Sequence, residues 1–383
     1  MDKSLRVLLW YWGRRGGGAR YTLEIVRVLS ARQDLNLSLS LSRQSELYHF
    51  FNDFSVSSRF DVDTYKNIFQ FALGFFRLPF LRFYFKRYIK KNNFDVIFCT
   101  MDHMWGSFVI SSIRDLGLPY LLTVHDGTRH PGEDNFARSW LLKRDIKYSD
   151  TILVLSKAVA LSLNANYSYP QNRIFLSKHG HFGISDFNLK PRKFPSDRPV
   201  RLLFFGRILE YKGLDILLSS LILLRSEFPK LELQIWGTGD IKPYLDLISA
   251  LGNVHVQNRW INEEEIPNIF LSADLAVLPY REASQSGVAP TAFAYGMPCI
   301  ATPLPGLCEQ VLDSVNGVIS KGFSPEDFAF AISKLLRDPL FYNRLSNGCI
   351  VASSTTLSWE EISKSVVDAL HSTRYLGKRI NLN

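Results

Sequence analysis

Short apolar runs alternate with longer amphipathic segments along the whole chain. The runs have the length of strands and the segments between them have the length of helices, which is typical of parallel sheets built from right-handed βαβ units. The pattern occurs once in each half of the chain. It predicts strands within residues 5–12, 35–42, 94–100, 119–126, 151–156, 173–180, 201–206, 231–237, 254–257, 275–279, 299–302 and 317–320.

A stretch rich in proline and charge, KPRKFPSDRP at residues 190–199, separates the two series of runs. We interpret it as a linker and hinge between two α/β domains. The predicted division is a first domain at residues 1–190, a linker at 191–199, a second domain at 200–358 and a terminal helical segment at 359–383.

The 383-residue chain has a formal charge of +9, and its two halves differ in charge. Residues 1–198 contain 29 Lys and Arg against 17 Asp and Glu (net +12), whereas the remainder contains 16 against 19 (net −3). We expect the basic half to face an anionic partner, either nucleic acid or an anionic membrane surface.

The four cysteines, Cys99, Cys299, Cys308 and Cys349, form no metal-binding pattern. Their arrangement favours a reducing compartment and predicts no structural zinc. The apolar run near the amino terminus is too short for a signal peptide or a membrane-spanning helix. The sequence therefore predicts a cytoplasmic protein.

The stretch from Pro279 to Pro305 has the features of a phosphate site. An apolar run ends at Pro279, and a polar loop leads through Ser286 and Gly287 into a short helix predicted from about Val288 to Tyr295. The N–H groups at a helix start lack partners within the helix and attract anions. The alternative is an ordinary strand–loop–helix unit without a ligand.

A second stretch, FFGRILEYKG from Phe204 to Gly213, strengthens the case for a phosphate site. A predicted strand ends at Gly206, and Arg207 and Lys212 lie on the loop that leads to the next helix. Two cations placed in this way could bind a diphosphate and stabilise it as a leaving group. Solvated surface cations are the alternative.

The segments GRILEYKG (206–213) and SQSGVAPTAFAYGMPCIAT (284–302) resemble the donor-site motifs of the family-4 retaining glycosyltransferases. That resemblance covers most of the second half. It implies the α/β GT-B fold, in which two Rossmann-like domains have parallel sheets that face across a cleft. It also implies that Arg207 and Lys212 hold the diphosphate of a nucleotide sugar, that no metal or cofactor is needed, and that the sugar is transferred with retention.

One feature departs from the motif of the resembling family. The family commonly has a Glu, seven residues and a second Glu, and Ala283 and Thr291 stand at those places. The resemblance implies that Thr291 binds the ribose with a single hydroxyl. Glu282, one residue earlier, would supply a carboxylate near the donor sugar, with Ser284 and Gln285 as polar neighbours. Either the loop is a modified version of the motif, or activity is reduced or lost.

Three glycines, Gly16, Gly17 and Gly18, lie between the first predicted strand and a helix expected to begin near Arg20. Glycines let a backbone approach a ligand closely, and the helix start is open to an anion. The segment is not GxGxxG, so a nicotinamide site is a weak alternative. The resemblance implies a place near the donor phosphate or the acceptor, and a flexible turn without a ligand remains open.

His125 and Asp126 end the predicted strand at residues 119–126. Carboxyl ends of parallel strands are where open α/β sheets bind ligands. The resemblance implies that His125 hydrogen-bonds the donor sugar or shapes the reacting centre. Asp126 is expected to orient His125, to receive an acceptor hydroxyl or to cap the next helix. A purely structural His is the alternative.

Histidines also occur in the segment from Lys178 to His181, where the resembling family often has Asn-Gly. We expect it to line the interdomain face. A metal site is the alternative, but no third ligand has supporting spacing.

The second half contains further candidate donor contacts. Gly237 and Gly239 resemble the family's turn near the nucleotide, and Arg259, Trp260 and Ile261 are expected near the base. Asp274 is expected to belong to the scaffold. The resemblance also implies that the helix expected at residues 359–376 packs back on the first domain.

Residues 68–91 contain nine aromatic residues and six cations. Interleaved rings and cations on a helix suit a membrane surface, with rings among the headgroups and cations against anionic lipid. We expect Pro79 to break or kink this helix. The alternative is a buried helix whose cations reach the surface.

Together these features predict a retaining glycosyltransferase that is peripherally bound to the inner face of the cell membrane. It would move sugar from a nucleotide-diphosphate sugar to a saccharide acceptor, lipid-linked as in cell-surface polysaccharide synthesis, without nucleic acid as partner. The expected catalytic residues are His125, Asp126, Arg207, Lys212 and Glu282. The expected donor-binding residues are Gly16, Gly17, Gly18, Gly206, Gly237, Gly239, Arg259, Trp260, Ile261, Ser284, Gln285, Ser286, Gly287, Val288 and Thr291.

Three other functions remain open at this stage. A nucleotide-sugar epimerase of the same fold would convert the donor without an acceptor. A binding protein that has lost catalysis would bind the donor and turn nothing over. A nucleic-acid binder would use the basic half and show strongly salt-dependent affinity.

Overall fold

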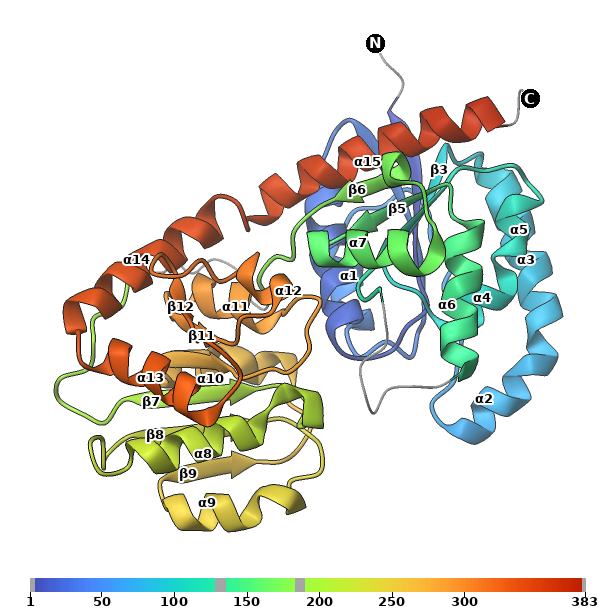
Figure 1. Ribbon diagram of the computed structural model, residues 1–383. Helices are drawn as coiled ribbons and strands as arrows, with labels where there is room; N and C mark the ends of the chain where they lie inside the picture. The colour runs from blue at the N-terminus through green and yellow to red at the C-terminus, as the bar shows by residue number, and fades with distance from the viewer. Residues whose placement is uncertain (1–3, 128–135, 183–189, 381–383) are drawn as a thin grey trace. The chain divides into compact units, whose positions relative to one another are not determined.

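The computed structural model describes residues 4–127, 136–182 and 190–380. These residues form two α/β units, each built on one parallel sheet (Figure 1). The first unit consists of residues 4–127, 136–178 and 359–380, and the second of residues 179–182 and 190–358. The prediction of two parallel sheets is therefore confirmed.

The first sheet has six parallel strands in the order β2-β1-β3-β4-β5-β6. The order reverses between β1 and β3, because β2 lies on one side of β1 and all later strands lie on the other. The strands are nearly all buried, as expected for a sheet covered on both faces. Their bounds are β1 Leu5–Tyr11, β2 Leu35–Leu41, β3 Val96–Cys99, β4 Tyr120–Val124, β5 Thr151–Val154 and β6 Ile174–Leu176.

Helices from both ends of the chain cover the first sheet. The helices of this unit are α1 Gly17–Ser30, α2 Ile68–Gly74, α3 Leu78–Asn92, α4 Met104–Val109, α5 Ser111–Arg114, α6 Phe136–Tyr148, α7 Lys157–Tyr167 and α15 Trp359–Ile380. Tight 3-10 turns lie at Tyr48–Asp53, Phe75–Arg77 and Gln171–Arg173. The long helix α15 contacts α1 and strands β3 to β6, and the hydroxyls of Thr373 and Thr151 are 2.5 Å apart. The terminal helix thus belongs to the first unit.

The second sheet has the order β12-β11-β10-β7-β8-β9, and its strands are again parallel. Its strands are β7 Arg201–Phe205, β8 Glu232–Trp236, β9 Val254–Gln257, β10 Leu275–Leu278, β11 Cys299–Ala301 and β12 Gly317–Ile319. Its helices are α8 Leu214–Leu224, α9 Leu245–Leu251, α10 Ile266–Ser272, α11 Val288–Ala294, α12 Pro305–Cys308, α13 Pro325–Leu336 and α14 Pro339–Ser354. Short 3-10 turns lie at Glu210–Lys212, Lys242–Tyr244 and Glu263–Glu265.

One predicted helix begins earlier than expected, and the break expected near Pro79 in another is present. The first helix begins at Gly17 rather than near Arg20, because Gly16 adopts φ 82° and ends the loop there. The single helix expected over residues 68–91 is divided into α2, a 3-10 turn and α3. Pro79 lies in the first turn of α3, where a missing N–H costs nothing.

The predicted linker makes hydrogen bonds with the second unit. The guanidinium of Arg192 donates to the carbonyls of Tyr295 (2.6 Å) and Phe270 (2.9 Å). Farther along, Arg198 donates through both terminal nitrogens to the carboxylate of Asp274, each at 2.7 Å. The predicted boundary at residue 190 also differs, since residues 179–182 group with the second unit.

Candidate active site

The second sheet reverses its strand order between β10 and β7. Open parallel sheets bind ligands at the carboxyl ends of their strands where the order reverses. The loop after β7 carries Arg207 and Lys212, and the loop after β10 carries residues 282–287. The fold therefore brings together the two stretches that the sequence singled out.

The loops after β7 and β10 touch each other. Gly213 adopts φ +65°, and a Cβ at this position would lie 1.9 Å from the carbonyl oxygen of Pro279. The Lys212 Nζ atom lies 3.8 Å from the ring centroid of the buried Tyr280. Because a cation is attracted to the face of an aromatic ring, this contact fixes the ammonium beside the second loop. Arg207 is exposed.

A pair of residues that the sequence analysis missed joins the two loops. Arg281 and Asp215 form an ion pair, with 2.8 Å between Nη1 and Oδ1, and the Arg281 amide donates to the Tyr211 carbonyl at 2.7 Å. The guanidinium lowers the pKa of Asp215. This carboxylate therefore stays charged and holds Arg281 beside the loop that carries Lys212.

The phosphate cradle expected at Ser286 and Val288 is partly occupied by the protein itself. The Ser286 amide donates to Gln310 Oε1 at 2.8 Å, and Gln310 Nε2 donates back to the Ser286 carbonyl at 2.9 Å. The Val288 amide donates to Ser286 Oγ at 3.1 Å. Two of the amides expected to face an anion thus already have partners, and more of the binding of a diphosphate would depend on Arg207 and Lys212.

Thr291, the expected ribose contact, is 2% exposed. Its hydroxyl donates to the Gly287 carbonyl at 2.8 Å and accepts from the Phe182 amide at 3.1 Å. Because a hydroxyl has one proton, Thr291 has none left for a ribose in this arrangement. The structure assigns it to fastening residues 180–182 onto the helix start.

The other polar candidates of the loop after β10 lie nearer the surface. Glu282 is exposed, whereas Ser284, Gln285 and Gly287 are half-buried. Gly306 packs against the back of this loop, where a Cβ would lie 2.2 Å from the Ser284 carbonyl oxygen. The loop is therefore supported from behind, and Glu282 faces solvent.

The candidates near β8 and β9 have mainly structural contacts. A Cβ on Gly237 would lie 1.8 Å from the Gly206 carbonyl oxygen, and one on Gly239 would lie 2.1 Å from the Ile208 carbonyl oxygen. These glycines allow the loops after β7 and β8 to pack. The predicted scaffold role of Asp274 is confirmed by its contacts with Arg198 and with the Arg201 amide.

The expected base contacts are divided between surface and core. Arg259 forms an exposed ion pair with Glu265, with Nη1 and Oε2 2.9 Å apart, and this contact lowers the pKa of Glu265 to about 2. Trp260 is half-buried. The Ile261 side chain belongs to the hydrophobic core, so it has no access to a base.

In the first unit, the loop that contains Gly16, Gly17 and Gly18 is also partly occupied by other side chains of the protein. The Gly16 amide donates to Glu46 Oε1 at 2.7 Å, so a carboxylate already occupies part of the place expected for an anion. A Cβ on Gly18 would lie 2.2 Å from Met101 Sδ, whereas one on Gly17 would meet nothing within 4 Å. Gly18 is thus required for packing, and Gly17 has open space beside it.

His125 lies at the carboxyl end of β4 and is 8% exposed. Its Nε2 atom is 2.9 Å from the Thr100 carbonyl oxygen. Because a carbonyl only accepts, this nitrogen carries the proton and Nδ1 is the acceptor nitrogen of the neutral ring. Burial lowers the pKa of His125, and the ring of Tyr21 packs edge-on at 4.9 Å between centroids. Asp126 is half-buried.

Asp102 and His103 lie where the first sheet reverses its order, and the sequence analysis missed both. Burial lowers the pKa of His103 to about 3, and its Nδ1 accepts from the Gly106 amide at 2.8 Å. The ring lies 4.9 Å from that of Trp10. The sequence could have indicated Asp102 and His103, because they are polar residues that follow the apolar run at 94–100. The same kind of signal identified His125.

The histidines at 179 and 181 lie in the second unit. His179 is buried, and its ring packs edge-on against that of Phe182 at 4.9 Å. In residues 4–127, 136–182 and 190–380, no group of three or more His, Cys, Asp or Glu could hold a metal ion. All four cysteines are free thiols.

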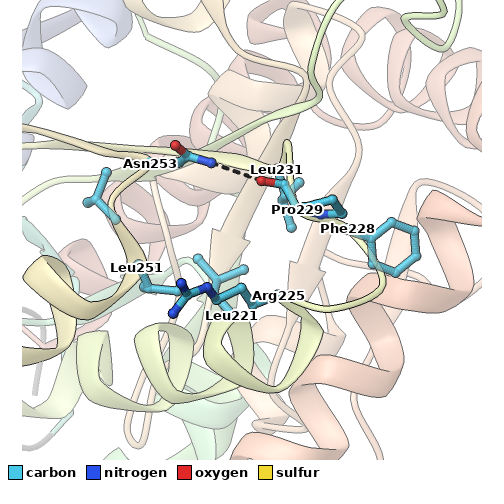
Figure 2. Close-up of a pocket in the computed structure, with 8 residues that line it drawn as sticks. Leu221, Arg225, Phe228, Pro229, Leu231, Leu251 and Asn253 are labelled. Atoms are coloured by element: carbon cyan, nitrogen blue, oxygen red, sulfur yellow. Dashed lines mark hydrogen bonds between the residues drawn. The ribbon is translucent and has the colours of Figure 1, made fainter.

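Two cavities of the second unit lie at the opposite, amino-terminal end of its sheet. Figure 2 shows one of about 20 Å³, next to the hydrogen bond from Asn253 Nδ2 to the Pro229 carbonyl. The other, of about 460 Å³, lies between residues 194–200 and 228–231. Because ligands of such sheets bind at the carboxyl ends, neither cavity is the candidate site.

Two family profiles match successive parts of the chain. "Glycosyltransferase Family 4" matches residues 15–180, and "Glycosyl transferases group 1" matches residues 199–338. An uncharacterized glycosyltransferase of Methanocaldococcus jannaschii is 25% identical over 72% of this chain and 75% of its own length. A D-inositol 3-phosphate glycosyltransferase of Arthrobacter is 30% identical over 44% of this chain and 42% of its own. The match thus spans less than half of that second relative.

Solved structures share the fold over the whole chain. Sucrose-phosphate synthase of Thermosynechococcus elongatus has a TM-score of 0.72 at 19% identity, covering 96% of this chain and 98% of that one. HepE of Anabaena in complex with UDP has a TM-score of 0.73 at 16% identity, covering 96% and 100%. At these identities the likeness shows the two-domain GT-B fold.

Proposed function

The chain belongs to the family-4 glycosyltransferases of GT-B type, and on that premise we propose that it transfers a sugar from a nucleotide-diphosphate donor to a saccharide acceptor. The observation that carries the proposal is the position of Lys212. Its ammonium lies over Tyr280 and so joins the two loops at the point where the second sheet reverses its order. A fixed cation there would stabilise the charge that develops on a departing diphosphate.

The proposed reaction breaks the bond between the anomeric carbon and the diphosphate oxygen. The electron pair leaves with the diphosphate, which Arg207 and Lys212 bind. An acceptor hydroxyl forms the new bond on the same face and gives its proton to a donor phosphate oxygen, so configuration is retained. Neither a metal ion nor a covalent nucleophile takes part in this scheme. We assign neutral His125 to a hydrogen bond from a donor hydroxyl to Nδ1.

We further propose that the acceptor is a lipid-linked saccharide used for cell-surface polysaccharide. A solved structure of similar fold (TM-score 0.68, 15% identity) is the lipopolysaccharide outer core galactosyltransferase WaaB. The free cysteines suit a reducing cytoplasm. We therefore place the enzyme at the cytoplasmic face of the membrane, although no helix in the described part of the chain is long and apolar enough to cross one.

The first test is a thermal-shift panel of UDP, GDP, ADP and CMP with their common sugars. A ligand at a hundredfold excess over its Kd stabilises the folded state by about 2.7 kcal/mol. We expect stabilisation by one diphosphate nucleotide, with UDP tested first because HepE was solved with it. The same panel is run on Lys212→Ala, in which we expect weaker stabilisation by the nucleotide. Lys242→Ala is the control, since Lys242 is an exposed lysine of the same unit.

The second test measures nucleotide release with and without lipid extract. Release that requires the extract supports the transferase, and the anomeric configuration of the product tests retention. Conversion of the donor sugar without an acceptor would indicate an epimerase, whose fold is also similar at a TM-score of 0.61. Stabilisation without turnover would indicate a binding protein with the altered residues Ala283 and Thr291. No stabilisation by any nucleotide would contradict the proposal.

A further inference from the structure

Helices α2 and α3, with the turn between them, present a large aromatic surface on the first unit. This surface, residues 68–91, is called the α2–α3 face here. Its side chains Phe69, Phe76, Phe80, Phe83 and Tyr84 are 57% to 79% exposed. The buried-helix alternative is therefore wrong for these rings. Exposed aromatic patches of this size mark interaction sites rather than ordinary surface.

The outward side of α3 has its rings in the first half and most of its cations in the second. Leu78, Phe85 and Ile89 face the core. On the exposed side, the rings at positions 80, 83 and 84 share the first half of the helix with Arg82, whereas Arg87, Lys90 and Lys91 occupy the second. At 1.5 Å per residue, the two groups are centred roughly 10 Å apart. This spacing matches an apolar end that dips below lipid headgroups and a basic end that stays among them.

Most of the cations of this face have no acidic partner in the part of the chain that the structure describes. Arg82 and Lys86 share Asp115 at 3.0 and 2.9 Å. Arg77, Arg87, Lys90 and Lys91 have no ion pair among the described residues, and residues 68–91 contain no Asp or Glu. A second copy of this face would bring like charges together, so charge complementarity favours an anionic partner over self-association.

An apolar groove continues the α2–α3 face. It has a volume of about 470 Å³, and its apolar lining includes Phe60, Phe80 and Tyr84. Arg43, Asp61, Asp63 and Arg77 also line it, and the two carboxylates are paired with Arg59 and Arg43. Some of the exposed rings therefore also line the groove. This increases the apolar area that a lipid surface could cover.

We propose that the α2–α3 face docks on an anionic lipid bilayer, with Phe69, Phe76, Phe80 and Phe83 entering the apolar layer and Arg87, Lys90 and Lys91 contacting lipid phosphates. The inference rests on the proposed function, because a lipid-linked acceptor gives the docking its purpose. Vesicle binding is measured without turnover, so a failure of the docking proposal can be distinguished from a failure of the proposed function.

The test is flotation of the full-length chain with vesicles of neutral phosphatidylcholine or of phosphatidylcholine with anionic phosphatidylglycerol. We expect strong binding to anionic vesicles that weakens in high salt. Phe80→Ser with Phe83→Ser should lower binding by about tenfold for each ring. Lys90→Gln with Lys91→Gln should lower it by about fivefold for each charge, and only on anionic vesicles.

Matched controls come from the second unit. Phe330→Ser with Leu340→Ser removes equally exposed apolar side chains, and Lys230→Gln with Lys242→Gln removes two exposed charges. Both should bind as the unmodified chain does. The proposal would be overturned if the control variants lost as much binding, or if the unmodified chain bound neutral vesicles equally well. It would also be overturned if sedimentation showed that the unmodified chain is a dimer and that the Phe80/Phe83 variant is a monomer. Unchanged nucleotide stabilisation in all variants would show that the donor site is intact.

Discussion

Both sheets of the protein have six parallel strands and reverse their strand order once, but they differ in what lines the edge where the order reverses. In the first sheet this edge carries Asp102 and a neutral His103 packed against Trp10. In the second sheet it carries Lys212, Arg207 and the Arg281–Asp215 ion pair. The first edge combines aromatic rings and a neutral histidine with a carboxylate, whereas the second carries two cations and an ion pair.

Under the proposed function, this difference suits the two edges to different ligands. A charged edge gains most from binding a diphosphate, whose charge grows as the sugar leaves. An edge of rings, histidines and a carboxylate suits hydroxyl groups and apolar sugar faces, because it supplies hydrogen-bond acceptors. Under the proposed function, the first edge would therefore bind the acceptor and the second the donor.

The largest effect is expected for Lys212→Ala. Removing a cation that faces developing charge should lower kcat by about 10²- to 10³-fold and weaken nucleotide binding. The melting temperature should change little by comparison, because a half-buried cation–ring contact contributes only about 1–2 kcal/mol. Steady-state kinetics and thermal melting check both parts, with Lys242→Ala as control. Turnover within threefold of normal would remove Lys212 from the site.

A smaller and more selective effect is expected for His125→Asn. Losing a hydrogen bond between the neutral ring and a sugar hydroxyl costs about 0.5–1.5 kcal/mol, which is about 2- to 13-fold in kcat/KM. Affinity for the free nucleotide should stay the same, since that ligand lacks the sugar. Calorimetry of nucleotide binding beside kinetics separates the two. His255→Asn, at an exposed position of β9, is the control. Equal losses in sugar transfer and nucleotide affinity would contradict the division between the edges.

Acid should weaken the first unit through His103. In the unfolded chain this side chain binds a proton below about pH 6.5, whereas in the folded unit it does so only near pH 3. Stability is therefore lost as pH falls from 6.5, at up to about 1.4 kcal/mol per pH unit. Urea unfolding at pH 7 and 5.5, followed by tryptophan fluorescence, measures the loss.

The matched variant for this measurement is His103→Asn, which keeps a side-chain cap on α4 but does not titrate. It should lose less stability over the same interval. Burial raises the pKa of Asp145, so this residue adds stability as the pH falls. Its contribution is the same in both proteins and cancels when their stabilities are compared. An identical pH dependence in the two proteins would rule out His103 as the cause.

The smallest effect on catalysis is expected for Thr291→Val. The variant leaves the buried Phe182 amide without its acceptor and should lose about 1–3 kcal/mol of stability. The KM for the donor should change less than threefold, because the hydroxyl is already engaged. A tenfold rise in KM at unchanged stability would instead restore Thr291 to the ribose.

The fold was largely predictable because its signal is local. Each apolar run became a strand, and Gly296 and Gly213 ended or began helices as their backbone freedom suggests. The meeting of the loops after β7 and β10 was also predictable, since the motifs resembled those of a family with known topology.

The partners within the site were not predictable, because they come from distant parts of the chain. Arg281 and Asp215 are 66 residues apart, and Gln310 lies 24 residues beyond Ser286. Glu46 reaches the amide of Gly16 across 30 residues. A sequence shows that a loop has polar groups but not which of them another side chain already occupies, so the phosphate cradle was expected to be more open than it is.

Helix α15 has a consequence for how the chain matures during synthesis. The described residues of the second unit end at residue 358, whereas the first unit lacks α15 until residues 359–380 have been translated. Until then the surface that α15 covers on β3 to β6 is open to solvent. The unit translated first is thus finished last, and a nascent chain that stalls before Trp359 would carry an exposed apolar sheet face for chaperones to bind.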